Sequence, residues 1–160
     1  MTIEVSIDTE TWEQADPVRR REWQLSIDEL GNADDLSFPE SASFLDVTVS
    51  GATTTLVLRS EDQELGQVEI PRSALSDHIT EYVDIVRQMD RAYEGAGSAR
   101  LEALDMAKKL AHDDAAKALR KLCKPISADH ATCRRLWTLL LTLQVDTTKL
   151  MGIRGHRPVR

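Results

Sequence analysis

The segment LWTLLLTLQV, residues 136–145, is the longest strongly apolar stretch of this 160-residue chain. Wound into a helix, it is apolar on nearly every side, which is typical of a helix buried at the centre of a domain. It is about half as long as the roughly 20 residues that a helix needs to cross a bilayer. We therefore expect a buried core helix, capped at Ser127, around which the rest of the chain packs.

Helical periodicity also marks most of the chain between Pro71 and this segment. Apolar residues recur at helical spacing over residues 75–94, and two glycines then interrupt the pattern. A second helix is predicted from Ser98 to a joint at residues 112–114, and the alanine-rich segment 115–122 predicts a third. With the apolar segment, this predicts a C-terminal bundle of about four helices.

The N-terminal half has the pattern of a small sheet. Alternation of apolar and polar residues predicts strands at residues 3–7, 44–49, 55–58 and 65–70. Between the first two strands, Asp16 and Pro17 are typical of a helix start, and Gly31 of a helix end, which predicts one helix of about 14 residues. We expect a single α+β domain over residues 1–145, with a small antiparallel sheet, and a basic, flexible tail over residues 146–160.

Composition is that of an ordinary soluble domain, 41% apolar and 29% charged. A chain of this length can bury a core without disulfides or metal. Cys123 and Cys133 are therefore expected to be buried thiols. The N-terminus lacks a basic segment followed by an apolar one, so we expect no secretory signal and a cytoplasmic protein with no membrane partner.

Charge divides the chain into two parts. Residues 1–90 hold 20 Asp and Glu against 6 Lys and Arg, whereas residues 91–160 hold 7 against 14. The two parts either attract each other in the fold or offer surfaces to a charged partner. A pI near 5.1 and an aromatic content of only 4% make nucleic acid an unfavourable partner for the basic part.

No catalytic motif stands out in the sequence. It has no glycine-rich phosphate loop, no nucleophile with an evident base and no metal-ligand spacing, so we expect no catalytic residue, no metal and no cofactor. His112, Asp113 and Asp114 form the densest set of potential ligands. We interpret them as a cap for the helix beginning at Ala115, with binding of a hard cation as the alternative.

Arg134 and Arg135 lie where the apolar segment begins, and a guanidinium there can bind a carboxylate through two hydrogen bonds. Adjacent residues on a helix point about 100° apart, so the two arginines should not face one pocket equally. We expect one of them to bond a carboxylate or carbonyl of the acidic half, and the other to contact a ligand or partner.

Two stretches, LEALDMAKKLAHDD at residues 101–114 and ATCRRLWTLLLTL at residues 131–143, resemble a bacterial group designated uncharacterised protein family 0262. Members carry I-D-M-x-R-R-x-x-H-N-E and, some twenty residues later, D-T-A-R-R-L-F-T-L. The positions that match these motifs are Asp105, Met106, Lys108, Lys109, Arg134, Arg135, Leu136, Thr138 and Leu139. The resemblance implies a common fold and a bacterial cytoplasmic setting, and it carries no activity.

These observations favour a small, non-enzymatic protein that binds another protein, as a regulator, inhibitor or assembly factor. A second copy of the chain is one candidate for that partner. The first alternative is a small-ligand sensor or an enzyme, with a site near Asp105, His112, Arg134 and Arg135. The second is nucleic-acid binding through the basic C-terminal helices. The candidate ligand- or partner-binding residues are Asp105, Lys108, Lys109, His112, Arg134 and Arg135.

Overall fold

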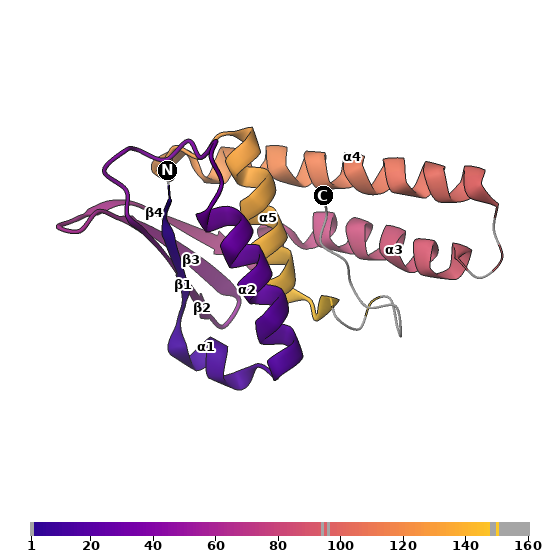
Figure 1. Ribbon diagram of the computed structural model, residues 1–160, viewed down its shortest axis with the longest axis horizontal. Coiled ribbons are helices and arrows are strands. Elements are labelled where there is room, and N and C mark those ends of the chain that lie inside the picture. Colours follow the sequence, from indigo (N-terminus) through magenta and orange to yellow (C-terminus); the bar gives the residue numbers. More distant parts are fainter. Residues whose placement is uncertain (1, 94, 96, 148–149, 151–160) are drawn as a thin grey trace.

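A four-stranded sheet and five helices make up the computed structural model, which describes residues 2–93, 95, 97–147 and 150. The elements in chain order are β1 (Glu4–Ile7), α1 (Thr9–Gln14), α2 (Pro17–Gly31), β2 (Phe44–Ser50), β3 (Thr53–Arg59), β4 (Glu64–Pro71), the 3-10 turn η1 (Arg72–Ala74), α3 (Ser76–Ala92), α4 (Ser98–Leu122), the 3-10 turn η2 (Lys124–Ile126) and α5 (His130–Gln144). Helices α2 and α5 lie beside the sheet, and α3 and α4 run side by side away from it (Figure 1). The predicted α+β class is confirmed.

The sheet has the order β1-β2-β3-β4, and β2, β3 and β4 form the antiparallel meander that the alternation predicts. Gly51 makes the turn between β2 and β3 with φ of 58°, a conformation that favours glycine. The prediction of a wholly antiparallel sheet is wrong for β1, because Val5 pairs in parallel with Leu45 of β2. Helices α1 and α2 carry the chain back between the two strands, as a parallel connection requires.

Asp8 explains a helix that the sequence analysis did not predict. Its Oδ2 accepts a hydrogen bond from the backbone N of Thr11 at 3.1 Å, which caps the short helix α1. Its Oδ1 accepts another from the backbone N of Val49 at 2.9 Å. One carboxylate therefore joins the end of β1 to β2 and starts α1, so the N-terminal half holds two helices rather than one.

Helix α2 begins as predicted and ends for a different reason. Asp16 caps it by accepting a hydrogen bond from Arg19 N, and Pro17 is its first residue. Gly31 is the last residue of the helix, where we had expected it to follow the helix end. A Cβ at Gly31 would lie 2.7 Å from the carbonyl O of Ile3, so glycine is needed there for the close approach of α2 to the residue before β1.

The predicted joint at residues 112–114 is wrong, because α4 is one continuous helix of 25 residues. His112, Asp113 and Asp114 therefore lie inside a helix, and they cap no helix beginning at Ala115. Burial explains the continuity: the side chains at Ala111, Ala115 and Leu119 are almost wholly buried, and α4 packs against α3 and α5. The described residues after the sheet consequently form three α-helices rather than four.

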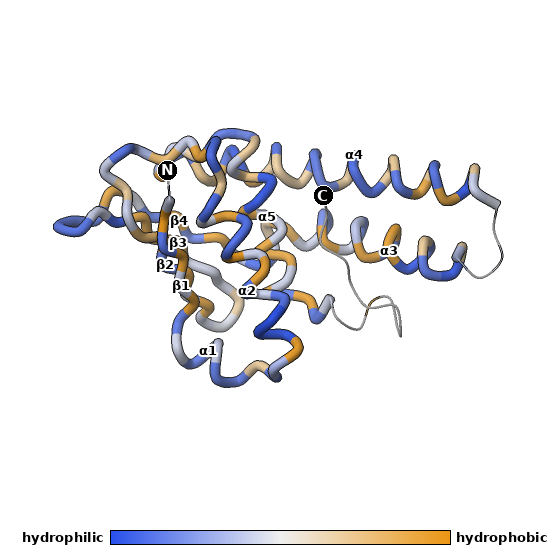
Figure 2. Tube along the Cα trace, in the orientation of Figure 1, coloured by the Kyte–Doolittle hydropathy of each residue, from blue (hydrophilic) through white to orange (hydrophobic). Residues whose placement is uncertain are grey.

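Helix α5 is the buried helix that the apolar segment predicts. Trp137 and Leu140 are wholly buried within it, and hydrophobic residues gather where α5 meets the strands (Figure 2). Its cap is Asp129, whose carboxylate accepts a hydrogen bond from Thr132 N at 2.9 Å, and not Ser127 as expected. Ser127 has φ of 57° and turns the chain between η2 and α5.

The C-terminal end of α5 accepts hydrogen bonds from three long side chains elsewhere in the fold. Trp23 Nε1 donates to the carbonyl O of Thr142 at 2.8 Å, and Arg19 Nη2 donates to that of Leu143 at 3.0 Å. Arg72 Nη2 donates to the carbonyl O of Gln144 at 3.1 Å. The last carbonyls of a helix have no partner within it and carry partial negative charge, so these donors stabilise α5.

Cys123 and Cys133 are buried free thiols, as predicted. No helix in the described part of the chain is both long and apolar enough to span a membrane. Most of the tail predicted over residues 146–160 lies outside the described residues, so its flexibility stays a prediction.

We expect Leu140→Ala to lower the free energy of unfolding by about 2–5 kcal/mol, because it leaves a cavity in place of a wholly buried side chain. Leu25→Ala on α2 is the matched control, since Leu25 is 42% exposed. Chemical denaturation of both variants measures the difference. Equal small losses in the two variants would contradict a central position for α5.

Candidate functional site

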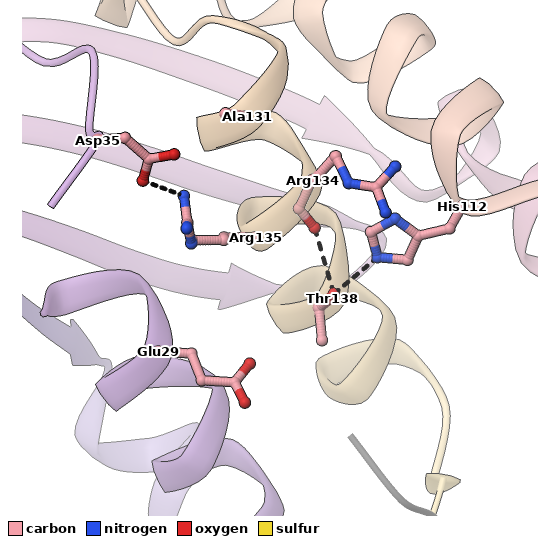
Figure 3. Close-up of a pocket in the computed structure, with 7 residues that line it drawn as sticks. All are labelled: Glu29, Asp35, His112, Ala131, Arg134, Arg135 and Thr138. Atoms are coloured by element: carbon pink, nitrogen blue, oxygen red, sulfur yellow. Dashed lines mark hydrogen bonds and ion pairs between the residues drawn. The ribbon is translucent and has the colours of Figure 1, made fainter. Parts of the chain in front are cut away.

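A cavity of about 520 Å³ lies beside α5, and residues of α2, the loop after α2 and α4 form its other walls (Figure 3). Its floor is one face of α5, because residues three, four and seven positions apart share a face of a helix. The residues that line it are Glu29, Asp35, His112, Ala131, Arg134, Arg135 and Thr138. Four of these belong to α5, and the others come from α2, from the loop directly after α2 and from α4.

The two sides of the cavity differ in charge. Glu29, on α2, and Asp35, in the loop after α2, provide carboxylates on one side. His112 reaches in from α4 on the other side, toward Arg134 and Thr138 (Figure 3). A polar ligand in this cavity would therefore meet cationic and anionic groups on opposite walls.

His112 is the most buried polar group of the cavity, with an exposed fraction of 3%. Its Nε2 lies 3.0 Å from Thr138 Oγ1, and the hydroxyl of Thr138 donates to the carbonyl O of Arg134 at 3.2 Å. Thr138 has a single hydroxyl proton, so both hydrogen bonds form together only when Nε2 carries the ring proton. Nδ1 is then a bare acceptor, and it has no hydrogen-bond partner among the described residues.

The surroundings of His112 keep its ring neutral. Burial, followed by the positive charges of Arg134 and Lys108, lowers the pKa of His112 from 6.5 to about 4. The ring also packs edge-on against Trp137, with 5.1 Å between ring centroids. His112 is thus a neutral hydrogen-bond acceptor, held in place on both sides and adjacent to the Arg134 guanidinium (Figure 3).

Arg134 shares its carboxylate partner with two other groups. Its Nη1 lies 3.2 Å from Oδ1 of Asp113, and the same oxygen contacts His130 Nε2. The other oxygen of Asp113, Oδ2, lies 3.3 Å from Lys117 Nζ. The hydrogen bond from His130 is the main cause that lowers the pKa of Asp113. The carboxylate of Asp113 thus contacts three basic groups. The other nitrogens of Arg134 bond no side chain in the described part of the protein.

Arg135 has a different partner. Its Nη1 lies 2.7 Å from Oδ1 of Asp35, across the cavity from Arg134. Asp35 belongs to the acidic N-terminal half, so one of the two arginines forms an ion pair with that half, as expected, although its Nη1 makes no hydrogen bond in the described part of the protein. Both arginines nevertheless line the same cavity, with their guanidinium groups directed to opposite sides (Figure 3).

The other three candidate residues lie on α4 outside the cavity lining. Lys109 Nζ is 3.1 Å from Asp105 Oδ2, and this exposed pair lies one helical turn apart. Lys108 is partly buried one turn before His112, where burial lowers its pKa. It acts on the cavity through its charge rather than as a lining residue.

Sequence reasoning missed three polar residues of the cavity. Thr138 could have been predicted from the sequence, because it lies one turn after Arg134 on the same face of the helix. Glu29 and Asp35 carried no such signal, since only the packing of α2 and its following loop beside α5 brings them there.

Among the described residues, no three His, Cys, Asp or Glu side chains are grouped so that they could hold a metal ion.

Comparisons with known proteins give two matches. A family model described as "Uncharacterised protein family (UPF0262)" matches residues 1–146. A UPF0262 protein of Paramagnetospirillum magneticum (strain ATCC 700264 / AMB-1) is 30% identical over 90 residues, a match that spans 55% of this chain and 57% of that relative. No solved structure matches the chain.

The pKa of His112 predicts how stability depends on pH. Because its pKa is about 4 in the folded protein and about 6.5 in the unfolded chain, the unfolded chain binds the extra proton between these values. The contribution of His112 to the free energy of unfolding is therefore lost as the pH falls. Between pH 7 and pH 5 this group alone lowers the free energy of unfolding by about 2 kcal/mol.

We expect His112→Gln to remove this part of the pH dependence, which denaturant titrations at pH 7 and pH 5 would measure. His78→Gln on α3 is the control for loss of a histidine at a less buried position. If the His112 variant lost as much stability between the two pH values as the wild type, the ring would not be held neutral.

Proposed function

The chain belongs to the uncharacterised protein family UPF0262, as its two motif stretches predict, and we propose that it binds a small organic anion in the cavity beside α5. The observation that carries the proposal is Nδ1 of His112, which is buried beside the Arg134 guanidinium and has no hydrogen-bond partner among the described residues. A buried polar atom without a partner costs about 1–3 kcal/mol. A ligand that donates to Nδ1 removes this cost, which favours its binding.

Arg134 supports an anionic ligand. A guanidinium presents several donors in one plane, and its Nη1 contact with Asp113 uses only one edge of that plane. Asp113 keeps His130 and Lys117 as partners when Arg134 turns toward a ligand, so its charge stays compensated. The positive charge of Lys108, one turn from His112, adds to the attraction.

This proposal takes up the small-ligand alternative of the sequence analysis. It makes the protein a sensor or carrier of its ligand, in a cytoplasmic setting, and it assigns no catalytic residue. Nucleic-acid binding has weaker support, because Lys109, Lys117, Arg134 and Arg135 all have acidic partners within the chain. These ion pairs reduce the positive charge that the basic helices offer to phosphate groups.

A protein partner is the second candidate, and the surface of α4 supports it. Met106 and Leu110 lie one turn apart on α4 with exposed fractions of 59% and 58%. They lie on the pair of helices α3 and α4 that extends away from the sheet (Figure 1). A regulator or assembly factor would use such an exposed apolar pair as its contact.

The test of the first proposal is a binding screen with small carboxylates and phosphates, followed by calorimetry on the compounds that raise the melting temperature. We expect Arg134→Gln to weaken binding at least tenfold, because it removes the cation that pairs with the ligand. Arg21→Gln on the exposed side of α2 is the matched control and should bind like the wild type. Equal affinity in the two variants would refute this site.

The test of the second candidate uses the double variant Met106→Ser, Leu110→Ser. We expect it to lose a protein that the wild type retains in pull-downs from native extract, or to lose self-association in light scattering. Because both side chains are exposed, the variant should unfold at the same denaturant concentration as the wild type. A partner retained by the double variant would place the contact elsewhere.

A further inference from the structure

The hydrogen-bonding groups around His112 restrict what the ligand can offer. In the tautomer that satisfies both hydrogen bonds of Thr138, Nε2 of His112 carries the ring proton, and Nδ1 can then only accept a hydrogen bond. Arg134 can only donate, because a guanidinium has no acceptor. The two groups are neighbours in the cavity (Figure 3), so one small ligand has to present a donor and an anionic acceptor close together.

The donor of the ligand has to be uncharged. Arg134 and Lys108 both act on His112 with positive charge, and burial excludes the water that would screen that charge. An ammonium group placed against Nδ1 would meet repulsion from these two cations. A hydroxyl donates the same hydrogen bond without carrying charge, so this position favours a hydroxyl over an amine.

The opposite wall restricts the rest of the ligand. Glu29 lines the cavity from α2 and Asp35 from the loop after it, and Asp35 is already paired with Arg135. The carboxylate of Glu29 would repel a second anionic group on that side. One carboxylate on a short chain therefore suits the cavity better than two.

We infer that the ligand is a 2-hydroxymonocarboxylate, whose carboxylate binds Arg134 and whose hydroxyl donates a hydrogen bond to Nδ1 of His112. This inference rests on the proposed function and names the chemical class of its ligand. The acceptor is preorganised, because the contact with Trp137 and the bond to Thr138 hold the ring in place without a ligand. A site built to bond a hydroxyl rejects the analogue that lacks it, since the buried acceptor is then left unpaired.

The experiment compares lactate, propionate and alanine, which differ only in the group on the carbon next to the carboxylate. Calorimetry on the wild-type protein measures the three affinities, and both enantiomers of lactate and alanine are used. We expect one enantiomer of lactate to bind at least tenfold more tightly than propionate and than either enantiomer of alanine. In His112→Gln the difference between lactate and propionate should fall to less than threefold.

A second measurement does not depend on the folding of a variant. The Nδ1 resonance of ¹⁵N-labelled His112 in the wild-type protein should shift on saturation with lactate, as a bare imidazole nitrogen does on accepting a hydrogen bond, and shift less on saturation with propionate. An equal shift with both compounds would overturn the inference.

The outcomes separate this inference from the proposed function. If lactate and propionate bind equally, or alanine binds best, the hydroxyl is not recognised and the inference is wrong, while anion binding at Arg134 stands. If other anions of the screen bind and no 2-hydroxymonocarboxylate does, the inference is again wrong. If no small anion binds, the proposed function itself fails.

Discussion

Burial of α5 is the constraint on which the rest of the structure depends. A helix that is apolar on nearly all sides excludes water from its side chains, but its end groups and its remaining polar face still need partners. Asp129 supplies one at the N-terminal end, and Trp23, Arg19 and Arg72 supply them at the C-terminal end. These contacts join α2, η1 and α5 into one unit, and the rest of the fold is arranged around it.

The same constraint accounts for the cavity. The face of α5 that carries Arg134, Arg135 and Thr138 is too polar to be covered by an apolar helix surface. The structure instead places charged and polar groups opposite it, with Asp35 in an ion pair with Arg135 and Asp113 in one with Arg134. Two buried side-chain atoms of the lining residues nevertheless have no hydrogen-bond partner among the described residues, Nδ1 of His112 and Nη1 of Arg135, and natural cores leave few such atoms unpaired. A polar atom of this kind at the wall of a cavity is more readily explained by a ligand than by stability.

Where sequence reasoning failed, long-range packing overrode a local signal. Three consecutive polar residues at 112–114 are typical of a break, yet each has a place in the continuous helix α4: His112 faces α5, Asp113 bonds residues of α4 and α5, and Asp114 is exposed. The parallel pairing of β1 with β2 was missed for a similar reason. Alternation of residues identifies a strand but contains no information on its direction relative to a partner.

The sequence by itself determined the α+β class, the buried helix, the start of α2 and three lining residues of the cavity: His112, Arg134 and Arg135. Periodicity, caps and turn residues are local properties, so they can be read along the chain. Only the tertiary structure decided the rest: the carboxylates of Glu29 and Asp35 on the opposite wall, the shared use of Asp113, and the neutral state of His112. Each of these depends on burial and on charges from segments far apart in the sequence, and no local pattern encodes which segments will meet.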